Sequence, residues 1–464
     1  MATAGPDTKP DIGVIGALSI GIGGIVGGGF FATFGMAIVG ARGATYLSFL
    51  VGGAIALLTA YSYVRLTLRY PDPGGTVTFV RLGFGQGLAA ASINVLLILS
   101  YVAIMAVYAL ALGSYSASYF PADQRGTWTV ILASGAIVLL GLVNFAGAAL
   151  MERSEGVFNA GKLAILAAFI VGGLVLGEPS WERLGPAEWV PLATIISSGM
   201  IVFLAYEGFE LIANAAPQIR NPSRTLPIAF YGSVLAAIVI YVFAVGVAIG
   251  HMPFAAMEAA RDFALSAAAE RFMGAFGFAL MTVGAVFASA SAINADFFGA
   301  EKLPVMLADH GELPKVFARM ISGRALASLI SIGVLALLAV NLLDLHALSA
   351  ASSGGFLIVF AAVNLANAKL AKETGSRRWI SVVAALACIV ALAIMVVQFA
   401  ASPATRGSAY AVIGIVMHLM IFVTMDVGPF TPLSLAYYVT VVHPWEWERA
   451  LRRVPSSPAE VLSQ

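Results

Sequence analysis

Long apolar runs alternate with short polar gaps along the chain from residue 13 to residue 425. Each run is close to the roughly 20 residues that an α-helix needs to cross a bilayer. The pattern therefore predicts an all-α polytopic membrane protein with about twelve transmembrane helices. The expected spans are 13–40, 44–69, 86–118, 128–149, 154–177, 192–218, 227–251, 270–305, 325–342, 346–368, 379–400 and 408–425.

The composition agrees with a chain that lies mostly in lipid. Of its 464 residues, 60% are hydrophobic and only 11% are charged, whereas soluble domains carry roughly 25% charged residues. Residues 1–12 are polar and lack the apolar core of a signal peptide, so the first span is expected to stay as a helix. A formal net charge of +1 argues against nucleic acid as a partner. The single cysteine and the scattered histidines offer neither a disulfide framework nor metal-ligand spacing, and we expect no cofactor.

The distribution of basic residues predicts the orientation. With the N-terminus in the cytoplasm, 18 of the 25 lysines and arginines fall in cytoplasmic segments, 6 fall outside, and one, Lys162, falls within a span. Positive charge collects on the cytoplasmic side of membrane proteins. We therefore expect a multi-pass protein of the cell membrane (inner or plasma membrane) with both termini in the cytoplasm.

Two spans contain residues that are unusual for an unbroken helix. The first contains GIGGIVGGGFF, residues 21–31, although each glycine in a helix interior costs about 1 kcal/mol relative to alanine. The sixth contains FLAYEGFELIANAAP, residues 203–217, with two glutamates, an asparagine and a terminal proline. These spans begin two consecutive sets of five, which is the pattern of an inverted-repeat transporter with paired broken helices.

The predicted organisation follows from these positions. A cytoplasmic tail, 1–12, precedes a first five-helix repeat, 13–177, and a second, inverted repeat, 192–368. Two additional helices, 379–425, then lead into a cytoplasmic segment, 426–464. This last segment contains HPWEWERALRRVP, whose tryptophans and arginines are typical of an interfacial anchor.

A broken helix exposes backbone groups that lipid cannot satisfy, so it survives only beside protein or a water-filled cavity. The half-helix after a break presents free N–H groups and a positive dipole end, which suit a carboxylate. The half-helix before the break ends in free carbonyls, which suit an ammonium group. Two facing breaks therefore have the chemistry to bind both ends of a zwitterion. The alternative is that the glycines only let helices pack closely, as Gly23 with Gly27 would.

Three stretches resemble the APC superfamily of amino acid–polyamine–organocation transporters. They are IVGGGFF in the first span, FLAYEGFELIANAAPQIRNPSRTLPIA from the sixth, and SASAINADFFGAEKLPVMLADHGELPKVF from the eighth. The similarity covers residues 13–320, and the last four spans match by hydropathy alone. The resemblance implies a LeuT-type fold of five plus five inverted helices with two extra helices, and transport by alternating access around a site at mid-membrane.

The resemblance also implies where a substrate binds. Backbone N–H groups at the first break would hold a carboxylate, those of Gly27, Gly28 and Gly29. Backbone carbonyls on both interrupted spans would hold an amino group, those near Ile22 and Gly23 and those of Phe203, Ala205 and Tyr206.

The glutamates of the sixth span have more than one interpretation. Glu207 matches a frequent side-chain contact with the substrate, and Gly208 beside it is included in the expected site. Glu210 matches a common acidic position. The alternatives are a protonated or outward-turned Glu207, and a Glu210 that only forms hydrogen bonds with neighbouring helices.

Lys162 lies in the fifth span, nine residues beyond Arg153. At 1.5 Å per residue this places it about 13 Å into the helix, roughly twice the reach of a lysine side chain. Lysines near helix ends do extend to the interface. A charge at this depth is instead expected to face a polar interior and to have a function.

The resemblance implies that the Lys162 ammonium occupies the place of the cation in sodium-driven relatives. It would bridge carbonyls near Gly23 to the eighth helix through Ser289 or Ser291. Desolvation disfavours the charged form of a buried lysine, so Lys162, together with Glu210, is predicted to couple transport to protons without sodium. The alternative is a permanently charged strut in an amino acid exchanger.

Three further polar residues lie near the depth of the breaks. Tyr101 in the third span is expected either to contact the substrate or only to pack. Asn294 and Asp296 lie in the eighth span, and relatives usually carry a small hydroxyl residue where Asp296 stands. Asp296 would pair with Lys162 or Lys302, join a proton path, or contact the substrate.

These features favour a secondary active transporter that imports amino acids and is coupled to protons. A transporter of the same fold for an amine, a polyamine or a cation is the closest alternative, because of Glu207 and Asp296. Exchange without net uptake also fits. An intramembrane enzyme is not expected, since no nucleophile–base pair or metal-ligand set is recognisable at depth. A receptor or scaffold would not need two facing breaks with a buried lysine between them. The expected partners are a small-molecule substrate, protons and the lipid bilayer.

Overall fold

The computed structural model describes residues 11–146, 149–311, 313–321 and 325–401, with Gly407 and Gly414. Within these residues the named elements are all helices, accompanied by two isolated backbone bridges. The α-helices are α1 Val14–Ile25, α2 Gly28–Ala41, α3 Thr45–Arg69, α4 Thr76–Phe84, α5 Leu88–Ala117, α6 Arg125–Ala146, α7 Ala149–Val175, α8 Leu192–Phe203, α9 Leu211–Asn214, α10 Pro222–His251, α11 Phe254–Ala259, α12 Ala264–Ala300, α13 Lys302–Asp309, α14 Leu326–Leu342, α15 Leu345–Lys369, α16 Ala371–Thr374 and α17 Arg378–Ala401. The 3₁₀ helices are η1 Trp181–Leu184, η2 Pro186–Glu188, η3 Leu204–Tyr206, η4 Ala216–Gln218, η5 Arg261–Phe263 and η6 Lys315–Ala318.

Nine segments among the described residues are long and apolar enough to cross a membrane. Two further segments correspond to the remaining predicted spans. α1 and α2 together form one span with a bend of 44°, and α14 is apolar but only 17 residues long. Each predicted span before residue 401 therefore has its helix, which confirms an all-α polytopic membrane fold. Apart from Gly414, the last predicted span, 408–425, and the C-terminal segment, 426–464, lie outside the described residues, as do residues 1–10.

The first span is interrupted within its glycine cluster. α1 ends at Ile25, and α2 begins at Gly28 after Gly27 adopts an extended conformation. The N–H of Val26 still donates to the Ile22 carbonyl, and the N–H of Gly27 turns back to Ile25. Because α2 starts a new helix here, its first N–H groups have no carbonyl of a preceding turn to bind.

The sixth span is interrupted as well. α8 ends at Phe203 and passes through η3 before Glu207 becomes extended. Gly208 has a φ of +111°, a conformation that glycine adopts easily and other residues adopt rarely. α9 begins at Leu211. Both interruptions predicted from the sequence are therefore present.

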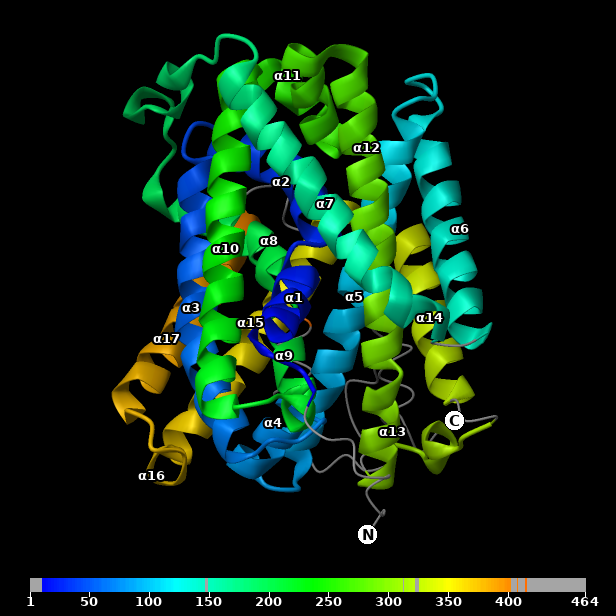
Figure 1. Ribbon diagram of the computed structural model, residues 1–464, viewed down its shortest axis with the longest axis vertical. Helices are drawn as coiled ribbons and strands as arrows, with labels where there is room; N and C mark the ends of the chain where they lie inside the picture. Colours follow the sequence, from blue (N-terminus) through cyan, green and yellow to red (C-terminus); the bar gives the residue numbers. More distant parts are fainter. Residues whose placement is uncertain are drawn as a thin grey trace, which may run out of the picture.

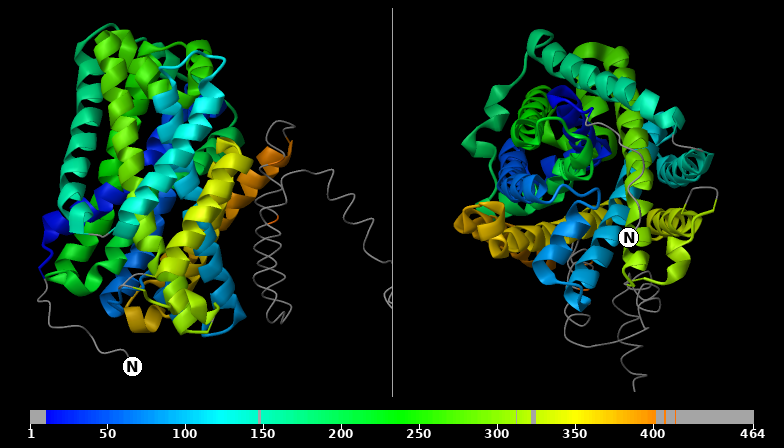
Figure 2. Two further views of the ribbon diagram at one scale, coloured as in Figure 1. Left: turned by 90° about the vertical axis from the view of Figure 1, so that its right-hand side faces the viewer. Right: turned by 60° about the horizontal axis from the view of Figure 1, so that its bottom comes forward.

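The two interruptions lie inside the bundle (Figure 1). α1 packs against α10 and α9, while α2 packs against α5, α8 and α12. The end view in Figure 2 shows the first segments, in dark blue, enclosed by later helices. Residues 25–31 and 201–210 are all buried. The irregular backbone therefore contacts protein and not lipid, as unpaired backbone in a membrane requires.

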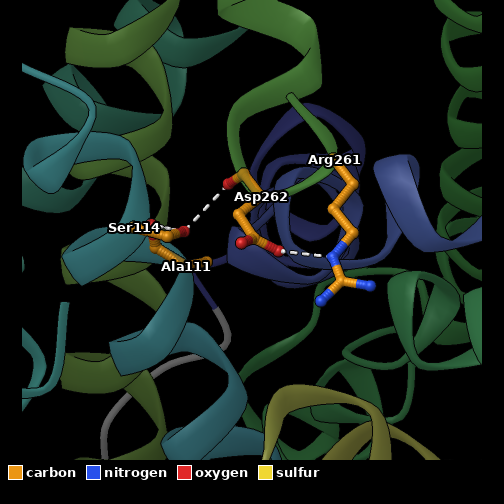
Figure 3. A network of polar contacts seen from close by, with 4 residues as sticks. All are labelled: Ala111, Ser114, Arg261 and Asp262. Atoms are coloured by element: carbon orange, nitrogen blue, oxygen red, sulfur yellow. Dashed lines mark hydrogen bonds and ion pairs between the residues drawn. The ribbon is translucent and has the colours of Figure 1, made fainter. Parts of the chain in front are cut away.

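The segment between α10 and α12 covers the end of the bundle at which α2 ends. It consists of α11 and η5, which pack on α2 and α5. Ser114 of α5 directs its hydroxyl toward the carbonyls of Asp262 and Ala111, at 2.9 and 3.1 Å, and Arg261 Nε lies 3.5 Å from the Asp262 carboxylate (Figure 3). A Cβ on Gly35 would lie 1.8 Å from the Arg261 carbonyl oxygen. The backbones of α2 and η5 are therefore in direct contact.

Buried polar side chains join α17 to α3 and α15. Asn367 of α15 donates to Ser381 of α17 at 2.8 Å and to Ser62 of α3 at 3.4 Å. The Ser62 hydroxyl in turn donates to Ser381 at 3.2 Å. Small polar residues let membrane helices approach closely and hydrogen-bond across their interface, so these contacts hold α17 against the bundle.

Candidate functional site

The two interrupted segments touch through glycines. A Cβ on Gly208 would lie 2.4 Å from the carbonyl carbon of Gly24, and a Cβ on Gly24 would lie 2.7 Å from the Gly208 carbonyl oxygen. A larger residue at either position would displace the opposite backbone. The close approach therefore requires glycine on both sides, and it brings the ends of α1 and η3 to one point within the bundle.

Tyr241 of α10 connects the two interruptions. Its hydroxyl oxygen lies 2.9 Å from the carbonyl of Ile25, where α1 ends, and 2.9 Å from the carbonyl of Ala205 in η3. The ring stacks on Phe30 of α2, with centroids 4.4 Å apart. One hydroxyl hydrogen is thus shared between two carbonyls of irregular backbone. Tyr241 was not predicted from the sequence, because a single tyrosine in an apolar run gives no sign of its partners.

Replacement of Tyr241 by phenylalanine is expected to loosen this junction. The change leaves two buried carbonyls without their donor, which costs about 1–3 kcal/mol. We expect the variant to unfold at a lower temperature in detergent and to transport more slowly than the wild type. Tyr46→Phe on α3 is the matched control, since the Tyr46 ring packs on Trp189 and its hydroxyl has no hydrogen bond within the described part of the chain. Equal thermal stability of the two variants would contradict the prediction.

A cavity of about 50 Å³ opens beside the junction. Water needs roughly 10–15 Å³ of such volume per molecule, so the cavity has room for a few waters. Its walls come from α1, α5, the second interruption, α9, α12 and α15. The lining includes Gly23, Gly24, Tyr101, Tyr108, Glu207, Gly208, Glu210, Ser291 and Asp296. The cavity therefore lies on the α1 and α9 side of both interruptions.

Three carboxyl side chains line this cavity, and they differ in their contacts. Glu210 accepts hydrogen bonds from the Tyr101 hydroxyl at 3.1 Å and from the Gly208 N–H at 2.8 Å. Glu207 is only 2% exposed, and among the described residues neither of its carboxyl oxygens has a hydrogen-bond partner. Oδ2 of Asp296 is also buried, with no hydrogen-bond partner in the part of the chain that the structure describes. Glu210 thus supports the second interruption, whereas Glu207 and Asp296 leave unpaired oxygens at the cavity.

Lys162 of α7 is 1% exposed, so its side chain does not extend to the membrane surface. Its Nζ donates a hydrogen bond to the Gly23 carbonyl at 2.7 Å. This contact with the end of α1 is the one expected from the resemblance. Of the two predicted serines of α12, Ser291 lines the cavity, while Ser289 is buried beside Gly28 and its hydroxyl has no hydrogen bond within the described residues.

Other residues of the expected site lie outside the cavity lining. Gly27, Gly28 and Gly29 are buried, and a Cβ on Gly28 would meet Ser289 and Tyr108 at 2.8 and 2.9 Å. Ile22 is partly buried, and its carbonyl is bound by the Val26 N–H.

The remaining side chains of the expected site point to other helices. The Tyr206 hydroxyl donates to the Phe49 carbonyl at 2.8 Å, and the Phe203 ring packs edge-on against Phe360. The side-chain oxygen of Asn294 accepts a hydrogen bond from Asn144 of α6. These residues therefore shape the surroundings of the cavity, and in this structure their side chains do not line it.

Comparison with known proteins places the chain in a family. The family model described as "Amino acid permease" matches residues 12–422. The chain belongs to the amino acid permease family of the APC superfamily. The permease is similar to an uncharacterized protein of Methanocaldococcus jannaschii, 30% identical over 78% of this chain and 83% of that protein. It is equally similar to an inner membrane transport protein of Escherichia coli, 30% identical over 78% of this chain and 84% of that protein. A cationic amino acid transporter of Arabidopsis thaliana is 27% identical over 69% of the permease and 58% of its own length.

The match includes every element that forms the cavity. α1, α5, α9, α12 and α15, together with residues 207–210 of the second interruption, all lie within residues 12–422 of the permease. The chain is therefore a multi-pass membrane permease for small molecules, and the cavity beside its two interrupted spans is the candidate substrate site.

Proposed function

We propose that this permease imports amino acids by alternating access, coupled to protons through Lys162 and independent of sodium. The observation that carries the proposal is the cavity at the junction of two interrupted spans, in a chain of the amino acid permease family. Carbonyl groups at the end of one half-helix and N–H groups at the start of the next are complementary to the two ends of a zwitterion.

The substrate would lie across the junction. Its amino group would bind at the end of α1, beside Gly24 and Glu207, which both line the cavity. Its carboxylate would bind the first N–H groups of α2, at Gly28 and Gly29. Because Tyr108 and Ser289 now cover Gly28, the second contact requires α2 to move relative to α5 and α12, and such a movement is part of alternating access.

Lys162 is the proposed proton-coupling residue. A charged ammonium makes a stronger hydrogen bond to the Gly23 carbonyl than a neutral amine does, so loss of the proton would weaken the tie between α7 and α1. Glu210, held by Tyr101 and Gly208, is the second proposed proton site. In its protonated form the lysine supplies a positive charge beside α1, which supports transport without a sodium ion.

The proposed orientation follows from the basic residues. With both termini in the cytoplasm of a cell-membrane protein, the α1 and α9 side of the interruptions faces inward. The cavity would then lie on the cytoplasmic side, and the segment of α11 and η5 would cover the opposite end.

Uptake by purified protein in liposomes tests the proposed function. A gradient of one pH unit, acidic outside, supports about tenfold accumulation if one proton enters with each substrate, because one unit corresponds to about 1.36 kcal/mol. We expect accumulation of radiolabelled amino acids under this gradient, with no change when potassium replaces sodium. Accumulation that follows sodium, or flux only when substrate is present on both sides, would contradict proton symport. The absence of any flux would contradict transport itself.

Transport of amines or cationic amino acids is the second candidate function. The three carboxyl side chains at the cavity favour it, because they are complementary to positive charge. The similarity to a protein named as a cationic amino acid transporter supports it further. Competition of uptake by simple amines and by neutral zwitterions separates the two candidates.

A further inference from the structure

Basic side chains gather where three membrane-spanning helices end or begin. α3 ends at Arg69, α15 ends at Lys369, and α17 begins at Arg378. α16 packs on both α3 and α15, and α17 packs on the same two helices. In Figure 1, α16 and the start of α17, in orange, lie beside the lower end of α3. The basic cluster at this place consists of Arg65, Arg69, Lys369, Lys372, Arg377 and Arg378.

The positive charge of the basic cluster is in large excess. Residues 61–70 and 369–378 contain these six basic residues and one acidic residue, a net charge of +5, whereas the whole chain has a net charge of +1. Arg65 is half-buried, and the other five basic residues are exposed. None of the six forms an ion pair within the part of the chain that the structure describes.

The two acidic residues nearest along the chain have other partners. The Glu373 carboxylate accepts a hydrogen bond from the Tyr70 hydroxyl. Oδ1 of Asp72 accepts hydrogen bonds from the Thr78 hydroxyl and the Gly74 N–H, both at 2.7 Å. The basic cluster therefore presents positive charge that an anion from outside the chain can neutralise.

Aromatic rings hold two of the guanidinium groups in place. Cζ of Arg65 lies 5.6 Å from the centroid of the Tyr61 ring, and Cζ of Arg69 lies 5.6 Å from that of Tyr70. A cation is attracted to an aromatic face at this distance. The Tyr61 hydroxyl also accepts a hydrogen bond from the Arg377 N–H at 2.6 Å, which joins α3 to the segment before α17. Side chains that are already held lose less freedom when they bind a ligand.

An exposed apolar face continues from the basic cluster along α17. Trp379, Val383, Leu386 and Val390 are 45–62% exposed, and their spacing of four, three and four residues places them on one side of the helix. Tryptophan is favoured at the boundary between lipid tails and headgroups. The order along α17 is therefore basic, aromatic and then apolar, which matches a phospholipid with its headgroup at the cluster.

We infer that the basic cluster binds the phosphodiester headgroup of an anionic phospholipid, whose acyl chains lie along the exposed face of α17. Guanidinium groups bind phosphate oxygens through paired hydrogen bonds, and basic clusters beside a membrane span attract anionic lipids. A zwitterionic lipid has no net charge with which to neutralise the cluster. In the proposed orientation the lipid belongs to the cytoplasmic leaflet. The site is separate from the cavity, so the inference does not depend on the proposed transport function.

Native mass spectrometry of the purified protein in detergent tests the inference on the wild type. The protein is titrated with phosphatidylglycerol and, separately, with phosphatidylcholine that has the same acyl chains. We expect the first molecule of phosphatidylglycerol to bind at least about tenfold more tightly, because several basic residues attract its net charge. Equal affinity for the two lipids would overturn the inference.

Thermal unfolding in detergent distinguishes a lipid from a free anion. A ligand that binds the folded state raises the unfolding temperature. We expect phosphatidylglycerol to raise this temperature more than phosphatidylcholine does, and inorganic phosphate at constant ionic strength to leave it unchanged. An equal rise with inorganic phosphate would identify a phosphate site and would contradict a lipid site.

Two double variants assign the site. Arg377→Gln combined with Arg378→Gln is expected to weaken phosphatidylglycerol binding by at least about tenfold and to change phosphatidylcholine binding by less than about threefold. Lys315→Gln combined with Arg319→Gln is the matched control. It removes the same charge from exposed residues in and beside η6, beyond α13 at the same end of the bundle as α16 (Figure 1). An equal loss in both double variants would show that net charge alone attracts the lipid, and the inference would fail.

The outcomes are independent of transport, because lipid binding is measured without it. A preference for phosphatidylglycerol that is lost in the cluster variant and kept in the control supports the inference, whether or not uptake is observed. If a part of the chain outside the described residues occupies the cluster instead, the wild type will bind both lipids equally, and the lipid site is excluded. The wild-type comparison needs no variant to fold, so instability of the cluster variant does not prevent the test.

Discussion

The Gly208→Ala variant is expected to lose transport and to unfold at a lower temperature than the wild type. Gly208 has a φ of +111°, and a residue with a side chain pays about 1–3 kcal/mol to adopt such a strained conformation. The added Cβ would also lie 2.4 Å from the Gly24 carbonyl carbon. Since that atom belongs to the backbone, the two interruptions must separate to relieve the contact. Uptake is expected to fall by at least about tenfold, the factor that about 1.4 kcal/mol produces.

Thermal unfolding in detergent and uptake into liposomes measure the two effects of Gly208→Ala. Gly135→Ala is the matched control, because Gly135 is an exposed residue within α6 where an added Cβ would meet open space. At a site without strain, this change is neutral or stabilises by about 0.4–1 kcal/mol through the unfolded chain. Wild-type uptake by Gly208→Ala would show that the backbone contact between the interruptions is not needed for transport.

The Lys162→Met variant is expected to lose uptake driven by a pH gradient. Methionine retains much of the buried volume but cannot donate to the Gly23 carbonyl, which Lys162 binds at 2.7 Å. Loss of a hydrogen bond from a charged donor costs about 1.5–3 kcal/mol, a factor of about 10–100. If Lys162 couples protons to transport, exchange of substrate across the membrane without a gradient should survive better than accumulation does.

A second lysine on the same protein provides the control for Lys162→Met. Lys369 at the end of α15 also donates to a backbone carbonyl, that of Gly83, and lies over the Phe84 ring, but it is exposed. Lys369→Met should therefore change uptake only slightly, as expected for exposed charge contacts. Equal accumulation by Lys162→Met and the wild type under an imposed pH gradient would defeat the proposed coupling. An equal loss of exchange and of accumulation would point instead to a fixed strut.

Hydropathy was sufficient to locate the spans before residue 401, because the thickness of the bilayer sets the length of an apolar run and the apolar interior disfavours charge within it. The absence of water in the bilayer core also predicted the two interruptions, because clustered glycines and glutamates within a span are tolerated only where protein replaces lipid. The depth of Lys162 likewise indicated a polar contact in the interior, and the structure confirms its bond to Gly23. Each of these results depends on one segment and its distance from the membrane surface.

The partners of the polar groups depended on the tertiary structure. Asn294 and Asp296 are two residues apart, so a helix points them in different directions, but only the rotation of α12 decided that Asp296 faces the cavity and Asn294 faces Asn144. The backbone between Glu207 and Glu210 is not a regular helix. The helical period therefore does not predict in which direction each of the two side chains points.

The sequence by itself thus determined that this chain crosses the membrane many times, that two of its spans are broken, and that one lysine is buried. The tertiary structure alone decided that the breaks meet at Gly24 and Gly208, that Tyr241 of a distant helix joins them, and that Glu207 has no hydrogen-bond partner among the described residues. The physical reason is that burial in lipid is a property of a segment, whereas a hydrogen bond requires the positions of two groups that lie far apart in the chain.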